Sequence, residues 1–358
     1  MSTLVAELTA VGELMEMPGL FSPPGSSGGR PATRIALSRR AGIVLGIDVG
    51  QRHVRAALVG PDHTILIEGE LALVAGLPQD QVLTKTAGVI EDVLREARVD
   101  LGELVSVGMG VPWLVGTAHP PAPTTADALH DFGTRGTVAR APTVVMQALG
   151  LPEQLPVSID NDANLGALGE WTWGAAEGFT DVVYVKVATG VGAGLILDGR
   201  LHRGVGGSAG EIGHVTTDPL GPRCVCGKRG CLEAMIGGPA LLANVYGNDR
   251  EQTIDDLVTA ARDGHQLARR VLAEAGHHLG ATLASVCDLL NPALVVIGGE
   301  LADADTLLLA PVRTSLHAAA AARSLGVAHV ATGQLGARAP LMGAIAVALE
   351  NACAHTAG

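Results

Sequence analysis

Four potential metal ligands lie close together in the sequence. Cys224, Cys226 and Cys231 fall within eight residues, and His214 precedes them. Three thiolates and an imidazole form the ligand set of a closed tetrahedral zinc site. A disulfide between Cys224 and Cys226 would be strained, because alternate residues of an extended chain point apart. Four protein ligands leave no position for water, so we expect a structural zinc rather than a catalytic one.

A run of acids and amides follows a short apolar stretch. Asp160, Asn161 and Asp162 come directly after residues 157–159. Such side chains at a strand end suit a hydroxyl-rich ligand, and an aspartate beside a substrate hydroxyl can act as the general base of phosphoryl transfer. Alternatively, Asp160 caps the helix that begins near Ala163, although a cap does not need both Asn161 and Asp162.

Two glutamates flank the predicted metal loop. Glu211 lies just before His214, and Glu233 lies just after Cys231. They could present carboxylates to sugar hydroxyls, or they could be acids at helix ends that face water. Because both flank glycine loops that the metal would hold rigid, we favour contact with a ligand.

Two glycine turns could hold phosphate groups through backbone N–H groups. The first is Asp48-Val-Gly50, and the second is Thr189-Gly190-Val-Gly192. Each signal is weak alone, since glycines also form ordinary hairpins. The chain has no Walker lysine motif, and neither turn has a dinucleotide-binding context.

The elements that must position these residues follow a repeated order. Apolar alternation and periodicity predict strands, then a helix, then another strand, and the same order recurs later in the chain. The strands are predicted at 43–49, 54–59, 63–67, 104–111, 157–159, 182–187, 192–197, 199–202 and 294–297, and the helices at 79–97, 238–246, 254–263, 266–290 and 339–352. This order indicates a duplicated α/β architecture with a cleft between two lobes.

Composition narrows the class of protein. The 358 residues are 47% hydrophobic and 17% charged, which excludes a disordered chain or a coiled coil. The formal net charge of −12 argues against a nucleic-acid surface over most of the chain. No apolar run reaches the length of a membrane span, and the N-terminus lacks the basic start of a secretory signal. Five cysteines, three of them clustered, fit a reduced cytoplasm.

The N-terminal segment is the basic exception. Residues 2–16 have helical periodicity, residues 22–31 are turn-rich, and four arginines follow without an intervening acid: Arg30, Arg34, Arg39 and Arg40. Composition alone favours a solvated linker over a wing that contacts phosphates.

The motifs together resemble the ROK family of repressors, open reading frames and sugar kinases, from about residue 42 to residue 350. The resemblance is carried by Gly46-Ile-Asp-Val-Gly50, Asn161-Asp-Ala-Asn164, Gly210-Glu-Ile-Gly-His214 and the segment from Cys224 to Glu233. It implies an actin/hexokinase-like (ribonuclease H-like) fold with two lobes around a central cleft. It also implies zinc on His214 and the three cysteines, and sugar contacts from Asn161, Asp162, Glu211, His214 and Glu233.

In kinase members the residue at Asp162 is the catalytic base, while Asp48 and the glycine turns hold Mg-ATP. This sequence departs from that pattern. Bulky residues 51–53 (Gln-Arg-His) stand where kinases have Gly-Thr, Trp113 replaces a glycine, and the second turn begins Ala-Thr rather than Gly-Thr. We therefore expect degenerate phosphate loops, although Arg52 could supply phosphate affinity instead.

The resemblance extends to the N-terminus, which is similar to the end of a winged helix-turn-helix domain and so favours wing and connector over linker. Residues 1–40 are predicted to be this partial domain, residues 41–155 with 340–358 one lobe, and residues 156–339 the zinc-containing lobe. Without the first two helices, a recognition helix is poorly supported in the major groove, so we expect weak DNA binding by this chain.

We interpret the sequence as a cytoplasmic, sugar-responsive transcriptional regulator that binds a sugar or phosphosugar and forms a homodimer or homotetramer. One alternative is an ATP-dependent, glucokinase-like hexose kinase with Asp162 as its base. Another is a sugar-binding protein without DNA function.

Overall fold

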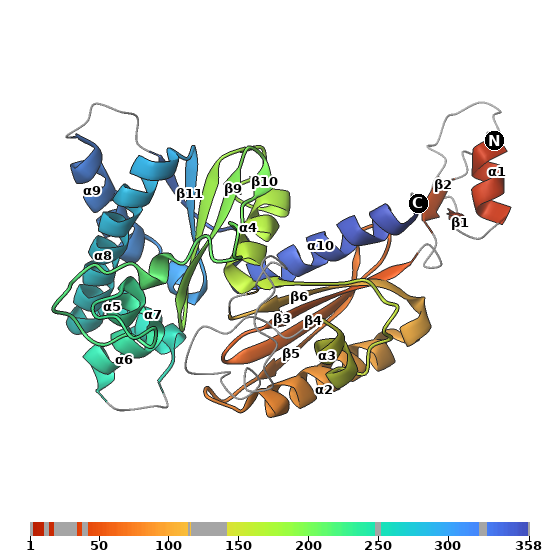
Figure 1. The fold of residues 1–358 in the computed structure, drawn as a ribbon, viewed down its shortest axis with the longest axis horizontal. Helices are drawn as coiled ribbons and strands as arrows, with labels where there is room; N and C mark the ends of the chain where they lie inside the picture. The colour runs from red at the N-terminus through yellow and green to blue at the C-terminus, as the bar shows by residue number, and fades with distance from the viewer. Residues whose placement is uncertain are drawn as a thin grey trace, which may run out of the picture.

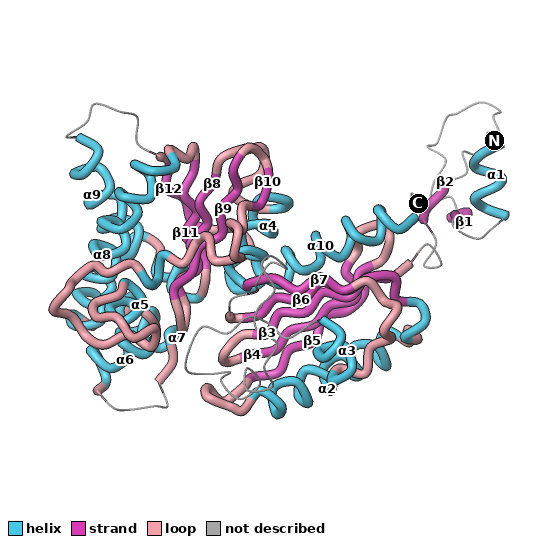
Figure 2. Tube along the Cα trace, viewed as in Figure 1, coloured by secondary structure: helices cyan, strands magenta, loops and turns pink. Residues whose placement is uncertain are grey.

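Two five-stranded sheets form the body of the molecule (Figure 1, Figure 2). The computed structural model describes residues 3–10, 14–17, 34–37, 42–113, 115, 142–247, 252–321 and 328–356. The first sheet has the order β5-β4-β3-β6-β7, with β3 antiparallel to β4 and parallel to β6. Its strands are β3 (Ile43–Val49), β4 (His53–Val59), β5 (Ile65–Ala72), β6 (Leu104–Val111) and β7 (Val157–Asn161).

Both faces of the first sheet are covered. Leu45 and Ile47 of β3 pack in one core with α2 (Gln79–Ala97). Val44, which points to the opposite face, packs with Ile345 of α10 (Ala339–Thr356). A strand buried on both faces needs no polar alternation, which explains the apolar run in this part of the sequence.

The second sheet has the order β10-β9-β8-β11-β12. Its strands are β8 (Val182–Val187), β9 (Val191–Leu197), β10 (Arg200–Leu201), β11 (Leu294–Gly298) and β12 (His329–Thr332). Helices α8 (Gln266–Leu290) and α9 (Thr306–Ala321) cover one face, and α4 (Asp162–Trp173) covers the other. We call the first sheet with α2, α3 and α10 the first lobe, and the second sheet with α4 to α9 the second lobe.

Short elements complete the two lobes. They are α3 (Pro142–Ala148), α5 (Leu232–Ile236), α6 (Gly238–Tyr246), α7 (Ile254–Arg262) and the 3-10 turns η2 (Leu101–Glu103), η4 (Ile212–His214), η5 (Glu300–Ala304) and η6 (Gly336–Arg338). Helices α5, α6 and α7 all pack against α8. In the part of the chain that the structure describes, no helix combines the length and apolarity that a membrane crossing requires.

Helices α4 and α10 lie against each other between the two sheets (Figure 1). A Cβ placed on Gly343 would lie 1.8 Å from the carbonyl oxygen of Leu165, and one on Gly169 would lie 2.4 Å from that of Ala339. Only glycine permits so close an approach. These two glycines therefore set the distance between the helices that join the lobes.

The N-terminal segment departs from the predicted single helix over residues 2–16. The helix α1 spans Thr3–Ala10 only, and β1 (Leu14–Met17) pairs antiparallel with β2 (Arg34–Leu37). The longer predicted helix would contain the glycine at position 12, and a glycine in a helix interior costs about 1 kcal/mol relative to alanine. The turn-rich stretch 22–31, together with Arg30, Arg39 and Arg40, lies outside the described residues.

Elsewhere most predicted elements agree with the structure, although the strand predicted at 63–67 lies at Ile65–Ala72 and neither α9 nor β12 was predicted. The helices at 79–97 and 266–290 and the strand at 104–111 are confirmed to the residue. The predicted lobe boundary at residue 156 needs correction, because β7 pairs with β6 in the first sheet. The short apolar stretch before Asp160 gave no sign of which sheet it would join.

Candidate metal centre and interlobe site

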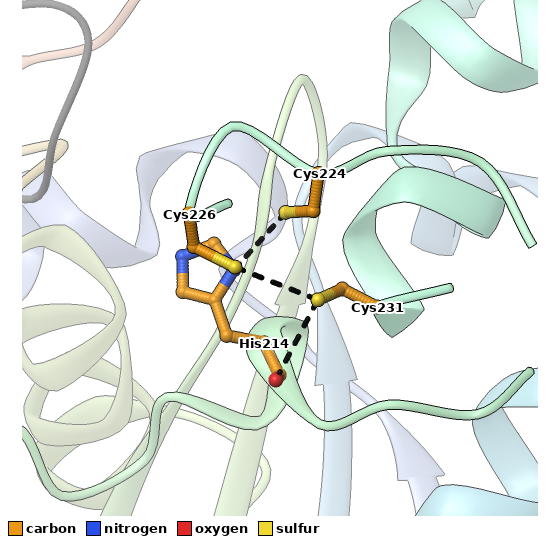
Figure 3. A group of neighbouring side chains, drawn as sticks. All are labelled: His214, Cys224, Cys226 and Cys231. Atoms are coloured by element: carbon orange, nitrogen blue, oxygen red, sulfur yellow. Dashed lines mark hydrogen bonds between the residues drawn. The ribbon is translucent and has the colours of Figure 1, made fainter. Parts of the chain in front are cut away.

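Three thiols and an imidazole converge at the predicted metal loop (Figure 3). His214 ends η4, Cys224 and Cys226 lie on the loop that follows, and Cys231 precedes α5. An antiparallel bridge between Thr216 and Cys231 folds the loop back on itself. The four ligand atoms all lie within 4.8 Å of one another.

The spacing of these atoms fits tetrahedral zinc. The Sγ atoms of Cys226 and Cys231 are 3.6 Å apart, and Cys224 Sγ lies 3.5 Å from His214 Nδ1. Tetrahedral zinc bonds of about 2.3 Å to sulfur and about 2.0 Å to nitrogen place two sulfurs about 3.8 Å apart, and a sulfur and a nitrogen about 3.5 Å apart. The residues present therefore match the group that the sequence predicts.

Protons and a metal ion would compete for the thiols of this loop. Burial, followed by the neighbouring sulfurs, raises the pKa of Cys231, and burial is the main cause of the raised pKa of Cys224. A metal ion among the sulfurs reverses this effect because it stabilises the thiolates. Metal uptake is therefore coupled to proton release at this loop.

Glu211 lies on the outer side of the same imidazole. His214 Nδ1 faces Cys224, while Nε2 lies 3.8 Å from Oε2 of Glu211. Burial raises the pKa of Glu211; the His214 charge lowers it, and the charges of Glu233 and Asp162 raise it further. The structure thus places three acids near the metal loop, close enough for their charges to interact.

Glu233 joins the metal loop to the second glycine turn. Its Oε2 accepts a hydrogen bond of 3.0 Å from the backbone N–H of Val191, and a Cβ on Gly190 would lie 2.8 Å from the same oxygen. A side chain at position 190 would therefore have to displace the Glu233 carboxylate. Glu233 thus lies at a helix end, as the alternative interpretation had it, but one of its carboxylate oxygens is bonded to the chain.

The cap of α4 is Asn161, whereas the alternative interpretation of the sequence assigned this role to Asp160. Asn161 Oδ1 accepts from the N–H of Ala163 at 2.9 Å, and its Nδ2 donates to the Trp113 carbonyl at 3.3 Å. Asp160 instead accepts from Arg203 Nε at 2.6 Å. The extended backbone of Asn161 lets its own side chain reach the first turn.

Asp162, the first residue of α4, pairs with a lysine of the neighbouring strand β8. Lys186 Nζ donates to Asp162 Oδ2 at 2.7 Å, and the two side chains are only 14% and 13% exposed. Sequence reasoning missed Lys186. The available signal was a single charge within the apolar strand Val182–Val187.

Asp48, at the end of β3, is fully buried and bonded to residues of its own lobe. His53 Nε2 donates to Asp48 Oδ2 at 2.9 Å, and Arg55 Nη1 lies 3.7 Å from the same oxygen. Burial alone raises the pKa of Asp48, but the His53 hydrogen bond and the charges of Lys186 and Arg55 outweigh it and hold the pKa below its ordinary value.

The His53 ring occupies the space beside the first glycine turn. A Cβ on Gly50 would lie 2.4 Å from the ring carbon Cε1 of His53. The residue that the sequence marked as bulky therefore packs onto the turn and bonds the adjacent carboxylate. Phosphate oxygens cannot approach the Gly50 backbone while this ring is in place.

A pocket of about 330 Å³ remains between the lobes. Its walls come from Arg52, His53 and Arg55 on the first lobe, and from Thr189 and residues of α6, α7 and η5 on the second lobe. Arg55 also donates to the carbonyl of Ala337 in η6 at 2.7 Å. The pocket thus lies where the sequence predicted degenerate phosphate turns.

The molecule has two lobes, each built on a five-stranded sheet, with α4 and α10 packed between them and a His/Cys₃ cluster in the second lobe. This is the architecture of an actin/hexokinase-like α/β protein. The chain belongs to the ROK family, whose model matches residues 44–351. This confirms the resemblance drawn from the sequence motifs.

Relatives in the family include regulators and kinases. The xylose repressor of Bacillus subtilis (strain 168) is 27% identical over 330 residues, which cover 91% of this chain and 82% of the relative. The DNA-binding transcriptional dual regulator NagC of Escherichia coli (strain K12) is 30% identical over 311 residues, which cover 82% of this chain and 72% of that one.

Solved structures of both kinds share the fold. A ROK family glucokinase from Streptomyces griseus, in complex with glucose and AMPPNP, has a TM-score of 0.70 and 28% identity, covering 86% of this chain and all of that one. A ROK family transcriptional regulator, a homologue of the E. coli MLC protein, also has a TM-score of 0.70, with 25% identity, and covers 99% of this chain and 89% of that one.

Proposed function

We propose that this protein is a sugar-responsive transcriptional regulator whose two lobes bind the sugar. The relatives named above as repressors or transcriptional regulators support this class. The regulator structure also matches 99% of this chain, whereas the glucokinase matches 86%. That difference is about the length of the N-terminal segment.

The observation that carries the proposal is the hydrogen bond between His53 and Asp48. A kinase of this fold needs the carboxylate at the end of β3 and the following turn for Mg-ATP. Here the carboxylate is bonded to His53 and Arg55, and the ring covers Gly50. The residues present do not fit Mg-ATP, and we derive no phosphoryl transfer from this site.

On the sugar side of the site, the chain has the residue types that the family resemblance implies. We propose that Asp162, Glu211, Glu233 and His214 accept and donate hydrogen bonds to sugar hydroxyls, with the Asn161 amide beside them. Glu233 holds the glycine turn through one oxygen, Oε2. His214 would bind zinc through Nδ1 and leave Nε2 toward the sugar.

Zinc would be held by His214, Cys224, Cys226 and Cys231. When bound, it supplies a fixed link between η4 and α5 and no open coordination position. Because η4 follows Glu211 and α5 carries Glu233, the link would fix the separation of two sugar-binding carboxylates.

DNA contact is proposed for residues 1–40. A helix followed by an antiparallel hairpin is the order of a recognition helix and its wing, and α1 contacts β1. Sugar binding would change the relative position of the lobes, and in a homodimer or homotetramer this would alter the spacing of the N-terminal segments. A ligand can do this only if it binds the two arrangements with different affinity.

Titration calorimetry with xylose, glucose, N-acetylglucosamine and glucose 6-phosphate tests the sugar site in zinc-loaded protein. We expect one of the panel to bind and Glu211→Gln to lose binding while keeping its zinc. The control Glu177→Gln changes an exposed glutamate and should bind as the wild type does. Binding that survives Glu211→Gln would place the site elsewhere.

A sugar kinase remains the second candidate because Asp162 is present and the glucokinase shares the fold. A coupled assay with Mg-ATP and the same sugars separates the two functions. We expect no sugar-stimulated turnover. Turnover that depends on Asp162 would replace the regulator proposal with the kinase.

A further inference from the structure

The Lys186 ammonium bonds a carboxylate of its own lobe, and its charge acts on a second carboxylate that belongs to the other lobe. It bonds Asp162 at the start of α4, and its charge also acts on Asp48 in the first sheet. The distances around Gly110 of β6 place Asp48 near α4. A Cβ on Gly110 would lie 3.1 Å from Leu165 of α4 and 3.7 Å from Asp48 Oδ1.

Asp48 is only partly satisfied by its own lobe. Oδ2 is bonded to His53, but among the described residues Oδ1 has no hydrogen-bond partner although it is fully buried. An isolated buried carboxylate is costly unless a positive charge lies nearby. Burial lowers the pKa of Lys186, yet Asp162 and Asp48 raise it above its ordinary value, so the ammonium stays charged.

We propose that Lys186 is a built-in cation that neutralises Asp48 and Asp162 together, at the place where a phosphoryl-transfer enzyme of this fold would use a divalent metal ion. The inference rests on the proposed function, since it explains how the site can be stable without Mg-ATP. It predicts that the wild-type cleft has no affinity for a divalent cation, because the tethered ammonium repels one.

The same geometry predicts what removal of the ammonium does. In Lys186→Met a side chain of similar length remains, but Asp162 loses its ion-pair partner and Asp48 keeps only the positive charges of its own lobe. Oxygen ligands of this kind attract Mn²⁺ and Mg²⁺. A divalent ion should therefore restore stability to the variant by binding the folded state.

Thermal unfolding of zinc-loaded protein, with and without Mn²⁺ as the probe, tests this proposal. A concentration of about 10 mM suits a site whose dissociation constant for Mn²⁺ is on the order of 1 mM. We expect Lys186→Met to melt lower than the wild type and to regain about 3 °C in Mn²⁺. The wild type should not shift. Lys85→Met, which removes the charge of an exposed lysine on α2, should not shift either.

The double variant Lys186→Met with Asp162→Asn should lose the Mn²⁺ response. Lys186→Gln provides a second variant if the methionine does not fold. Stabilisation of the wild type by Mn²⁺, or folded Lys186 variants that do not respond to it, would overturn the proposal. The melting temperature is measured without DNA, sugar or turnover, so failure of this proposal is distinguishable from failure of the proposed regulator function.

Discussion

Opposing forces act on the single carboxylate of Asp48. Burial penalises its charge, while His53, Lys186 and Arg55 stabilise it, and the balance favours the charged form. A residue in this position links folding to pH. The lowered pKa means that the folded protein releases this proton more readily than the unfolded chain, whose reference value is 3.8.

The sign of this linkage gives a prediction. Asp48 contributes stability that is present above about pH 4 and is lost as the pH falls through its folded pKa. Asp48→Asn should therefore lower the melting temperature most at pH 7, and the deficit relative to the wild type should shrink below pH 4. Glu91→Gln, an exposed carboxylate on α2, serves as the control. A deficit that stays constant with pH would show that Asp48 acts through packing alone.

Among the secondary-structure elements, the end of α4 depends on one buried glutamate. Glu170 is 1% exposed and accepts hydrogen bonds from the backbone N–H groups of Ala175, Gln334 and Leu335, at 2.8, 3.0 and 2.8 Å. The first of these follows α4, and the other two precede η6. A single side chain thus replaces the missing backbone partners of two turns and ties α4 to the chain that leads into α10.

Removal of this carboxylate should be costly. Glu170→Ala leaves three buried N–H groups without partners, at roughly 1 kcal/mol or more each. We expect the melting temperature to fall by about 6 °C or more. Glu170→Gln, which keeps one acceptor oxygen, should fall less, and Glu177→Ala nearby should be neutral. Equal melting temperatures for Glu170→Ala and the wild type would mean that water replaces the carboxylate.

The metal loop is the second element whose stability we expect to depend on a single side chain. If zinc is bound as proposed, Cys231→Ser should lose it and melt several degrees lower, because the metal would hold η4 against α5. Metal analysis should find one zinc per chain in the wild type and in Cys353→Ser, whose exposed thiol lies outside the cluster. Full zinc content in Cys231→Ser would remove this cysteine from the ligand set.

Sequence predicted the elements better than it predicted the contacts between them. Long periodic segments such as α8 were placed to the residue, and the spacing of the cysteines anticipated the metal cluster. Lys186 was missed because its partner Asp162 lies 24 positions away, on another element. Periodicity reports which side of a strand is buried, but it does not report which charge a buried lysine meets.

At the scale of the whole molecule, the chain passes between the lobes twice, through α4 and through η6 into α10. Charged contacts reinforce the second passage. Arg338 of η6 bonds Glu68 of β5, and Arg55 bonds the Ala337 carbonyl. Since η6 also packs on η5 of the second lobe, these contacts resist separation of the lobes. These contacts therefore hold the two lobes together beside the pocket that Arg55 and Ala337 line. We call η6 with these contacts the hinge.

This arrangement predicts that the hinge contributes to sugar affinity. If the sugar binds the closed arrangement, Arg338→Gln should weaken binding several-fold, because part of the binding energy must then close the lobes. Scattering should show a larger free molecule that still compacts at saturating sugar. Arg95→Gln is the matched control, since Arg95 pairs with Asp92 within α2 and spans no hinge. If Arg338→Gln binds sugar with wild-type affinity and the free molecule keeps its size, the prediction is wrong. The packing of α4 on α10 would then be sufficient to fix the relative position of the two lobes.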